Sequence, residues 1–268
     1  MQPSGPVWKP KSYIEGRWMT IAVLLLAGVT VFLAVVLQSA VGFGMALFAI
    51  PVLLWLGADL PTAVAMLVVS TAAQSFYGVA VYRQHIPWRA VWAVTPWRFA
   101  FMIAGVWLLW YLDALPRDTI KQIVGLTMLA ILLVQVALRI KPRARLHGGW
   151  TVLAGTLSGL MAGALGMGGP PIVLWAMAHD WPSRVTRSFF WAVFALLAPL
   201  QIAVMTIRFG YGIWAGLILG LALAPGTILA ARLGVKLGER MNRQRLRQVA
   251  LGILALIAAA AIAEPWLR

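Results

Sequence analysis

The sequence contains no cysteine and few acidic side chains for its 268 residues. Without cysteine it forms no disulfide, no thiolate metal site and no cysteine nucleophile. Only seven residues are Asp or Glu, and all charged residues together make up 11% of the chain. Soluble domains carry about 25% charged residues. The chain therefore has too few charges to cover the surface of a soluble domain of this size.

The acidic and histidine side chains all fall in loops or at the ends of apolar segments. They are Glu15, Asp59, Asp113, Asp118, Asp180, Glu239, Glu264, His85, His147 and His179. We therefore expect no proton relay or sodium site within the apolar segments, and no metal or other cofactor. Asp59 and Asp180 each precede a proline that opens a predicted helix, so both are expected to cap it.

What the sequence does contain is apolar: 62% of its residues are hydrophobic and 14 are Trp, a residue favoured at membrane interfaces. A net charge of +15 in a soluble protein suggests nucleic-acid binding. Here the basic residues lie mainly between apolar segments, where they set membrane orientation and contact anionic lipid headgroups. We therefore predict an all-α integral membrane protein with membrane lipids, and not nucleic acid, as partners.

A helix needs about 20 apolar residues to cross the hydrocarbon core. Continuous segments of this kind predict six spans: Thr62–Val81, Trp97–Leu112, Thr119–Ile140, Val185–Ile207, Tyr211–Ala231 and Leu246–Ala263. Two further apolar stretches, Trp18–Gly57 and Trp150–Ala178, are interrupted by glycine-rich breaks. The two pieces of the second stretch are short for comfortable spans, which predicts a hairpin that enters and leaves on one side.

The N-terminal 17 residues are polar and form a predicted segment of their own, 1–17. The apolar run that follows, Trp18–Leu37, is longer than the roughly 7–15 residues of a signal-peptide core. We interpret that run as part of the mature protein.

Short motifs recur in the same order in both parts of the chain. Pro51-Val-Leu-Leu-Trp55 is echoed by Pro171-Ile-Val-Leu-Trp175, and Asp59-Leu-Pro-Thr by Asp180-Trp-Pro-Ser. We predict two homologous membrane repeats, 18–140 and 150–268, joined by a basic cytoplasmic linker, 141–149. Each repeat comprises a broken-helix hairpin and three transmembrane helices.

Equivalent loops of the two repeats carry opposite charge bias. Residues 113–118 carry net negative charge, whereas the equivalent residues 232–247 are strongly basic. By the positive-inside rule the repeats are inverted relative to each other. We expect residues 83–89, 139–147 and 232–247 in the cytoplasm, and residues 113–118 and both termini outside, although Lys9, Lys11 and Arg17 weigh against an outside N-terminus.

The breaks are Gly42-Phe43-Gly44 and Gly166-Met167-Gly168-Gly169, the second followed by Pro170 and Pro171. A helix break survives at membrane depth only where protein or a water-filled cavity satisfies the backbone. Half-helices that begin after these glycines present free N–H groups and a positive dipole end to an anion. The alternative is helix packing by small residues, which we predict for Gly155, Gly159 and Gly163.

Few polar side chains lie within the apolar segments. Gln38 and Ser39 directly precede the first break, and Gln74 lies within the segment Thr62–Val81. Each is a candidate for the substrate pathway, with backbone hydrogen bonding inside its own helix as the alternative. Arg98, at the start of the predicted span Trp97–Leu112, is expected to snorkel to the interface.

The first break with its flanks, Gln38-Ser-Ala-Val-Gly-Phe-Gly-Met-Ala-Leu47, resembles the sulfite exporter TauE/SafE family, whose members are similar to 4-toluene sulfonate uptake permeases. Gly163-Ala-Leu-Gly-Met-Gly-Gly-Pro-Pro171 and Arg83-x-His-Ile-x-Trp-Arg89 carry the same resemblance, from about residue 31 to 263. The first motif departs from the commoner Gly-x-Gly-Gly-Gly form. The resemblance also implies an arginine in the stretch 185–189, which is Arg187 in this sequence. Arg187 would complete an anion site or else snorkel with Arg184.

The resemblance implies a secondary transporter, expected to be an exporter, of sulfite or an organosulfonate in the bacterial inner membrane. We expect alternating access around the two breaks, a small sulfur-containing anion as partner, and no enzymatic activity. The expected substrate-binding residues are Gly42, Phe43, Gly44, Gly166, Met167, Gly168, Gly169, Arg187, Gln38, Ser39 and Gln74. An intramembrane enzyme acting on lipid phosphate, or an uptake carrier for another small anion, is the alternative. The sequence leaves open whether the chain forms a homodimer.

Overall fold

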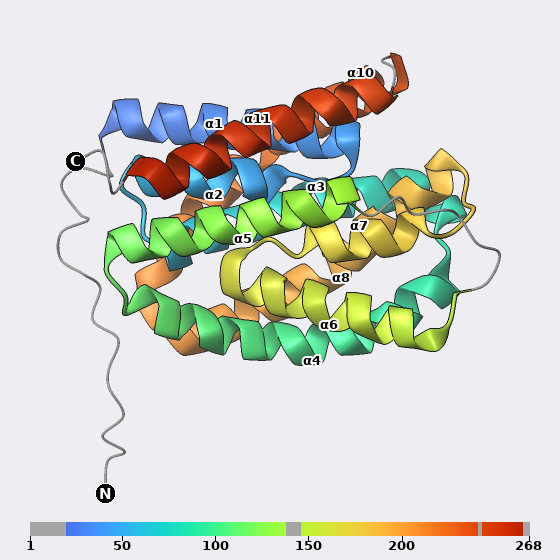
Figure 1. Ribbon diagram of the computed structural model, residues 1–268, viewed down its shortest axis with the longest axis horizontal. Coiled ribbons are helices and arrows are strands. Elements are labelled where there is room, and N and C mark those ends of the chain that lie inside the picture. The colour runs from blue at the N-terminus through green and yellow to red at the C-terminus, as the bar shows by residue number, and fades with distance from the viewer. Residues whose placement is uncertain (1–19, 138–145, 241–242, 265–268) are drawn as a thin grey trace, which may run out of the picture.

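A computed structural model describes residues 20–137, 146–240 and 243–264, and this part of the chain is almost entirely helical (Figure 1). The first half contains α1 (Ile21–Val41), α2 (Met45–Trp55), α3 (Leu60–Tyr82), η1 (Arg83–His85), α4 (Trp88–Asp113) and α5 (Arg117–Ala137). The second contains α6 (Gly148–Leu165), α7 (Gly169–Met177), α8 (Ser183–Phe209), η2 (Gly210–Ile213), α9 (Trp214–Ala222), α10 (Ala224–Arg240) and α11 (Arg243–Ala263). The predicted all-α class is confirmed. The segment 1–17 and most of the linker 141–149 lie outside the described residues.

Six of the described helical stretches are long and apolar enough to cross a membrane. Their outward faces carry exposed large apolar side chains, among them Leu33, Trp107 and Leu126. Such faces are suited to contact with lipid, because apolar side chains in the hydrocarbon core are not exposed to water. The chain is a multi-pass membrane protein.

Two predicted spans differ from the structure, and a proline lies at each difference. The span predicted from Trp97 begins at Trp88, and α4 continues through Pro96. The single span predicted over residues 211–231 is instead divided into η2, α9 and α10. The division falls just before Pro225, which cannot donate the next helical hydrogen bond.

The interrupted stretches also differ from expectation in the length of their first arms. Helices α1 and α6 are each long enough to cross the membrane, so the expectation that both pieces of the second stretch are too short is wrong for α6. Only the return arms are short, with 11 residues in α2 and nine in α7. At about 1.5 Å per residue, neither return arm spans a bilayer of about 30 Å.

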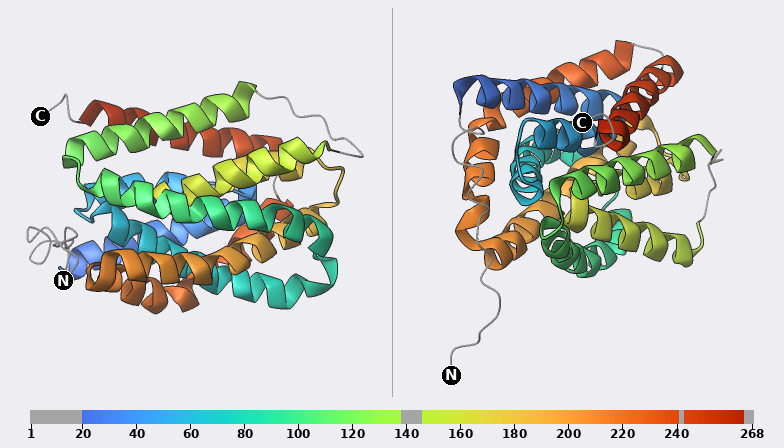
Figure 2. Two further views of the ribbon diagram at one scale, coloured as in Figure 1. Left: turned by 90° about the horizontal axis from the view of Figure 1, so that it is seen from below. Right: turned by 60° about the vertical axis from the view of Figure 1, so that its left-hand side comes forward.

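Both halves follow the same order: a long helix, a break, a short helix and three longer helical segments. The contacts follow that order too, because α1 packs on α10 and α6 on α4, whereas α3 packs on α8 and α5 on α11. In Figure 1, α1 and α5 run from left to right, whereas α6 and α11 run from right to left. The two further views in Figure 2 keep α5 beside α11.

Glycines bring α4 and α6 into backbone contact. A Cβ atom on Gly159 would lie 2.4 Å from the Arg98 carbonyl oxygen, and one on Gly163 would lie 2.3 Å from the Met102 oxygen. Gly155 packs in the same way against Trp97. The predicted packing role of Gly155, Gly159 and Gly163 is therefore confirmed, and this contact fixes the position of Arg98 in the bundle.

The predicted aspartate caps are not formed. Asp59 occupies the N-cap position of α3 but makes no side-chain capping bond, and the N-cap of α8 is Pro182 rather than Asp180. The loop before α8 is longer than the repeat predicted, which places Asp180 outside the helix end. Burial raises the pKa of Asp59 to about 6, with a smaller contribution from the charge of Asp113.

The raised pKa of Asp59 predicts that folding stability falls as pH rises from about 4 to 6. The folded state holds the Asp59 proton more tightly than the unfolded state, where the pKa is near 3.8. The free energy of unfolding decreases with rising pH wherever the native state binds more protons than the unfolded state. Asp59→Asn should therefore raise the melting temperature at pH 7 and leave it unchanged at pH 3.5. Melting curves in detergent at both pH values measure this, and equal wild-type and variant values at pH 7 would contradict it.

Candidate functional site

Three glycines at the two breaks have backbone conformations in the left-handed region. Gly42 closes α1 with φ 100°, and Gly44 opens α2 with φ 110°. In the second half, Gly166 closes α6 with φ 69°. A side chain at these positions is strained whatever space surrounds it, so these breaks require glycine.

Gly168 differs from this pattern, because its φ is −71°. A positive φ therefore does not explain the glycine at this position. Close approach explains the glycine instead: an added Cβ would lie 2.6 Å from the Ser158 carbonyl oxygen and 2.5 Å from the Ala162 Cβ. The second break thus folds back tightly onto α6.

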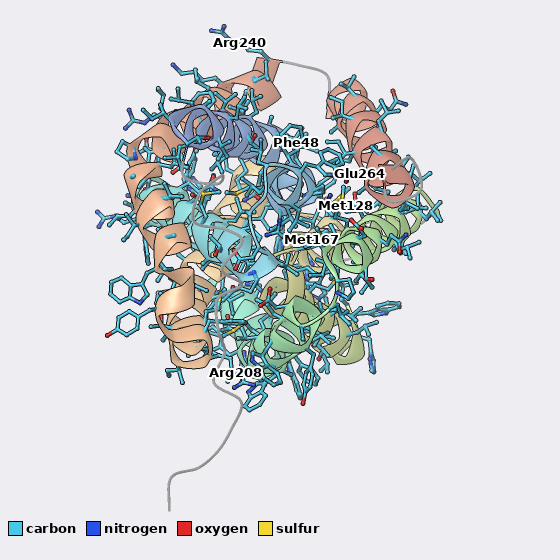
Figure 3. The ribbon with its side chains drawn as sticks, turned by 90° about the vertical axis from the view of Figure 1, so that its left-hand side faces the viewer. Phe48, Met128, Met167, Arg208, Arg240 and Glu264 are labelled. Carbon is cyan, nitrogen blue, oxygen red and sulfur yellow. The ribbon has the colours of Figure 1, made fainter. Side chains whose placement is uncertain are left out.

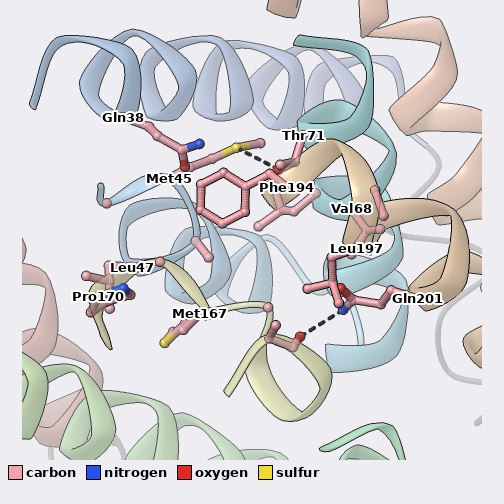
Figure 4. A pocket seen from close by; sticks show the side chains of 18 of the residues that line it. Gln38, Met45, Leu47, Val68, Thr71, Met167, Pro170, Phe194, Leu197 and Gln201 are labelled. Carbon is pink, nitrogen blue, oxygen red and sulfur yellow. Dashed lines mark hydrogen bonds between the residues drawn. The ribbon is translucent and has the colours of Figure 1, made fainter. Parts of the chain in front are cut away.

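The breaks from the two halves meet at one inner cavity of about 60 Å³. Gly44 and Met45 line it from the first half, and the run from Gly166 to Pro170 lines it from the second. Thr71 of α3 donates a hydrogen bond to the Met45 sulfur at 3.4 Å (Figure 4). The volume exceeds the roughly 10–15 Å³ that one water needs on this measure, so the cavity has room for a few heavy atoms.

The inner cavity lies at the centre of the bundle. Figure 3 looks along the long axis and shows Met167 near the middle, with Arg208 and Arg240 on opposite edges. Gln201 of α8 lines the same cavity and donates from Nε2 to the Ala162 carbonyl oxygen at 2.8 Å (Figure 4). This bond ties α8 to the last turn of α6 before the break.

A second, larger cavity of about 440 Å³ lies next to the first break, and we call it the vestibule. Gly42 and Phe43 line the vestibule, whereas Gly44 and Met45 line the inner cavity. Consecutive residues of one break therefore separate the two spaces. The vestibule also holds His179, whose pKa is lowered by burial, so this imidazole adds no charge there at neutral pH.

The predicted site residues fall into three groups. Those that line the inner cavity are Gln38, Gly44, Gly166, Met167, Gly168 and Gly169. Those that line the vestibule are Ser39, Gly42, Phe43 and Arg187. Gln74 lines neither space; it is fully buried and donates from Nε2 to the Met45 sulfur at 3.4 Å. Arg187 is paired with Glu239 at 2.7 Å, so its charge is already neutralised.

Arg98 does not snorkel, contrary to expectation. It is 1% exposed and lies near the middle of α4, where it lines the inner cavity. Its Nε donates to the Ser158 hydroxyl oxygen at 3.0 Å, and its Nη1 donates to the Val193 carbonyl oxygen at 2.7 Å. The predicted span began at Trp97, which placed this arginine at the membrane edge instead of at its centre.

Two helix N-termini face the inner cavity. The first residues of α2 and α7 line it, and neither helix has a side-chain N-cap bond. The first N–H groups of a helix have no intrahelical partner and carry its positive dipole end. In α7 only Gly169 of the first three residues has such a group, because Pro170 and Pro171 lack an N–H. No Asp, Glu or His is among the described residues that line this cavity, and no metal-binding group of three such residues occurs in the described part of the chain.

Comparison with known proteins identifies the family. The family model described as "Sulfite exporter TauE/SafE" matches residues 19–261. The chain belongs to this family. A curated relative, the "Probable sulfite/organosulfonate exporter TauE" of Cupriavidus necator, is 27% identical over 230 residues, which cover 83% of this chain and 87% of the relative. No solved structure matches the chain. This TauE/SafE protein is therefore a multi-pass membrane protein of a transporter family, placed in the inner membrane.

Proposed function

We propose that this TauE/SafE protein is a secondary carrier that exports a small sulfur-containing anion, such as sulfite or an organosulfonate. The observation that carries the proposal is the meeting of the two breaks at one central cavity. Each break supplies a helix N-terminus, which acts as roughly half a positive charge. With no acidic side chain among the described lining residues, nothing there repels an anion. The name of the Cupriavidus necator relative supports the same substrate class.

The carrier mechanism that fits this geometry is alternating access around the first break. Residues 42–45 separate the vestibule from the inner cavity. A small movement of this segment, between its two positive-φ glycines, would join the two spaces. Inverted repeats provide the two alternative arrangements that such a carrier needs, and the opposite directions of α1 and α6 support that relation between the halves (Figure 1).

The proposal makes the protein a carrier rather than an enzyme acting on lipid phosphate. Such an enzyme needs an acid, a base, a nucleophile or a carboxylate-bound metal beside its substrate. The described residues around the inner cavity provide backbone N–H groups, two glutamines, a threonine and an arginine. These groups bind and orient an anion but offer no group suited to proton transfer at neutral pH.

Purified protein in liposomes should move sulfite across the bilayer in a saturable manner. The physical reason is that a central anion cavity of limited size saturates, whereas leakage does not. Entry of labelled sulfite into proteoliposomes and into protein-free liposomes gives the comparison, and competition with sulfoacetate, thiosulfate and sulfate ranks the substrates. Identical rates in the two liposome preparations would overturn the proposed function.

A further inference from the structure

Arg98 carries a buried positive charge for which the described residues offer no counter-ion. Its Nε and Nη1 have neutral partners, the Ser158 hydroxyl and the Val193 carbonyl, whereas Nη2 is buried without a hydrogen-bond partner. The two ion pairs of the described chain join Lys121 to Glu264 and Arg187 to Glu239. A buried charge that is left unpaired is strongly unfavourable, so an arginine at this depth indicates a function.

The surroundings of Arg98 hold the guanidinium rigidly beside the second break. Ser158 accepts from Nε and itself donates to the Gly168 carbonyl oxygen at 2.5 Å. The Phe194 ring lies 5.3 Å from the Arg98 Cζ, within range of a cation–π contact. The glycine contact between Gly159 and the Arg98 backbone fixes the helix beneath it. Two consecutive hydrogen bonds therefore connect Arg98 through Ser158 to the second break.

We infer that Arg98 binds the transported sulfur oxyanion directly, with Nη2 as donor and the N-termini of α2 and α7 completing the site. This inference rests on the proposed function. It adds the side chain that binds the substrate and the substrate charge that this side chain selects. Planar guanidinium donors match the oxygens of such groups better than a point charge does. Ser158 is the positioning residue that aims the guanidinium.

The same electrostatics select the charge of the substrate. A singly charged –SO₃ group is attracted by one arginine and two dipole ends. A zwitterion such as taurine also brings an ammonium group, for which the described lining residues provide no carboxylate. Placing that ammonium beside Arg98 without a partner is unfavourable. The site therefore accepts methanesulfonate and sulfite and rejects taurine.

Anion affinity of purified variants tests the role of Arg98. Arg98→Gln should weaken sulfite binding by about ten- to a hundred-fold, the range expected for a charge-assisted hydrogen bond. Arg98→Lys keeps the charge but loses the planar fork and the Ser158 contact, so it should recover only part of the affinity. Ser158→Ala should weaken binding by about two- to ten-fold. Titration calorimetry of detergent-purified protein with sulfite measures all three.

Arg208→Gln is the matched control. Arg208 lies at the last turn of α8 over the rings of Trp107 and Trp110, away from the inner cavity. Its loss should leave sulfite affinity unchanged. If Arg98→Gln does not yield monodisperse protein, Arg98→Lys and Ser158→Ala carry the test. The inference would be overturned if a folded Arg98 variant or Ser158→Ala bound sulfite as tightly as the wild-type protein does. It would also be overturned if the wild-type protein bound taurine as tightly as methanesulfonate.

The transport assay separates this inference from the proposed function. Wild-type protein that moves no sulfite refutes the carrier itself. Wild-type protein that moves sulfite, beside an Arg98→Gln variant with unchanged KM, refutes only the assignment of Arg98. A raised KM in Arg98→Gln and a normal KM in Arg208→Gln support both.

Discussion

Gly168→Val should reduce sulfite transport to the level of protein-free liposomes. The Cβ of valine would lie 2.6 Å from the Ser158 carbonyl oxygen and 2.5 Å from the Ala162 Cβ, and the first of these contacts is backbone that cannot turn aside. The break must therefore move away from α6. That movement also breaks the bond from the Ser158 hydroxyl to the Gly168 oxygen, and it displaces the N-terminus of α7 from the cavity.

The matched control is Gly252→Val in α11, where an added Cβ meets nothing within 4 Å. Both variants add the same side chain within a membrane segment, so they differ mainly in whether the glycine touches α6. The control should transport at close to the wild-type rate. Size-exclusion profiles and melting temperatures of both variants show that they are folded. A folded Gly168→Val variant with wild-type transport would show that the second break does not form the site.

The sequence was sufficient to predict the fold class and the position of both breaks. Those features follow from composition and from glycine, which together decide where a helix in lipid can begin and end. The exact ends were less predictable. The span predicted from Trp97 begins at Trp88, because α4 continues through Pro96, whereas α10 begins one residue before Pro225. The residue type alone does not decide between these outcomes, because proline is tolerated both inside a membrane helix and near a helix start.

The missed role of Arg98 follows from that one boundary. A span that begins at Trp97 places Arg98 at the interface, where snorkelling is the ordinary behaviour. A span that begins at Trp88 places it at mid-membrane, where an ionisable side chain indicates a function. The signal available in the sequence was Ile86-Pro87-Trp88, because proline is favoured at a helix start. Gln201 gave no such signal, since its contact with Ala162 depends on how α8 crosses α6.

Arg187 shows the opposite limitation. Its position near the start of α8 suggested an anion ligand, but its partner Glu239 lies at the end of α10, far away in the sequence. A long-range ion pair of this kind has no local signature. The roles predicted for Ser39, Phe43 and Arg187 remain predictions, and their place in the vestibule makes them candidates for the entry path rather than for the inner cavity.

Single cysteines in equivalent loops should be labelled from opposite sides of the membrane. Gln84 follows α3 and Tyr211 follows α8, which are equivalent positions in the order of elements, and both side chains are exposed. Arg83, His85 and Arg89 surround the first loop, whereas the second has only Arg208, so the positive-inside rule places Gln84 in the cytoplasm and Tyr211 outside. Figure 1 shows these loops at opposite ends of the bundle.

The natural chain has no cysteine, so Gln84→Cys and Tyr211→Cys each report one position without background. A membrane-impermeant maleimide added to intact cells should label Tyr211→Cys almost completely and Gln84→Cys only after the cells are opened. Ala114→Cys, exposed in the loop between α4 and α5, is the control and should behave like Tyr211→Cys. Labelling of Gln84→Cys and Tyr211→Cys from the same side would contradict inverted repeats, because two halves related by an axis along the membrane normal place equivalent loops on one face.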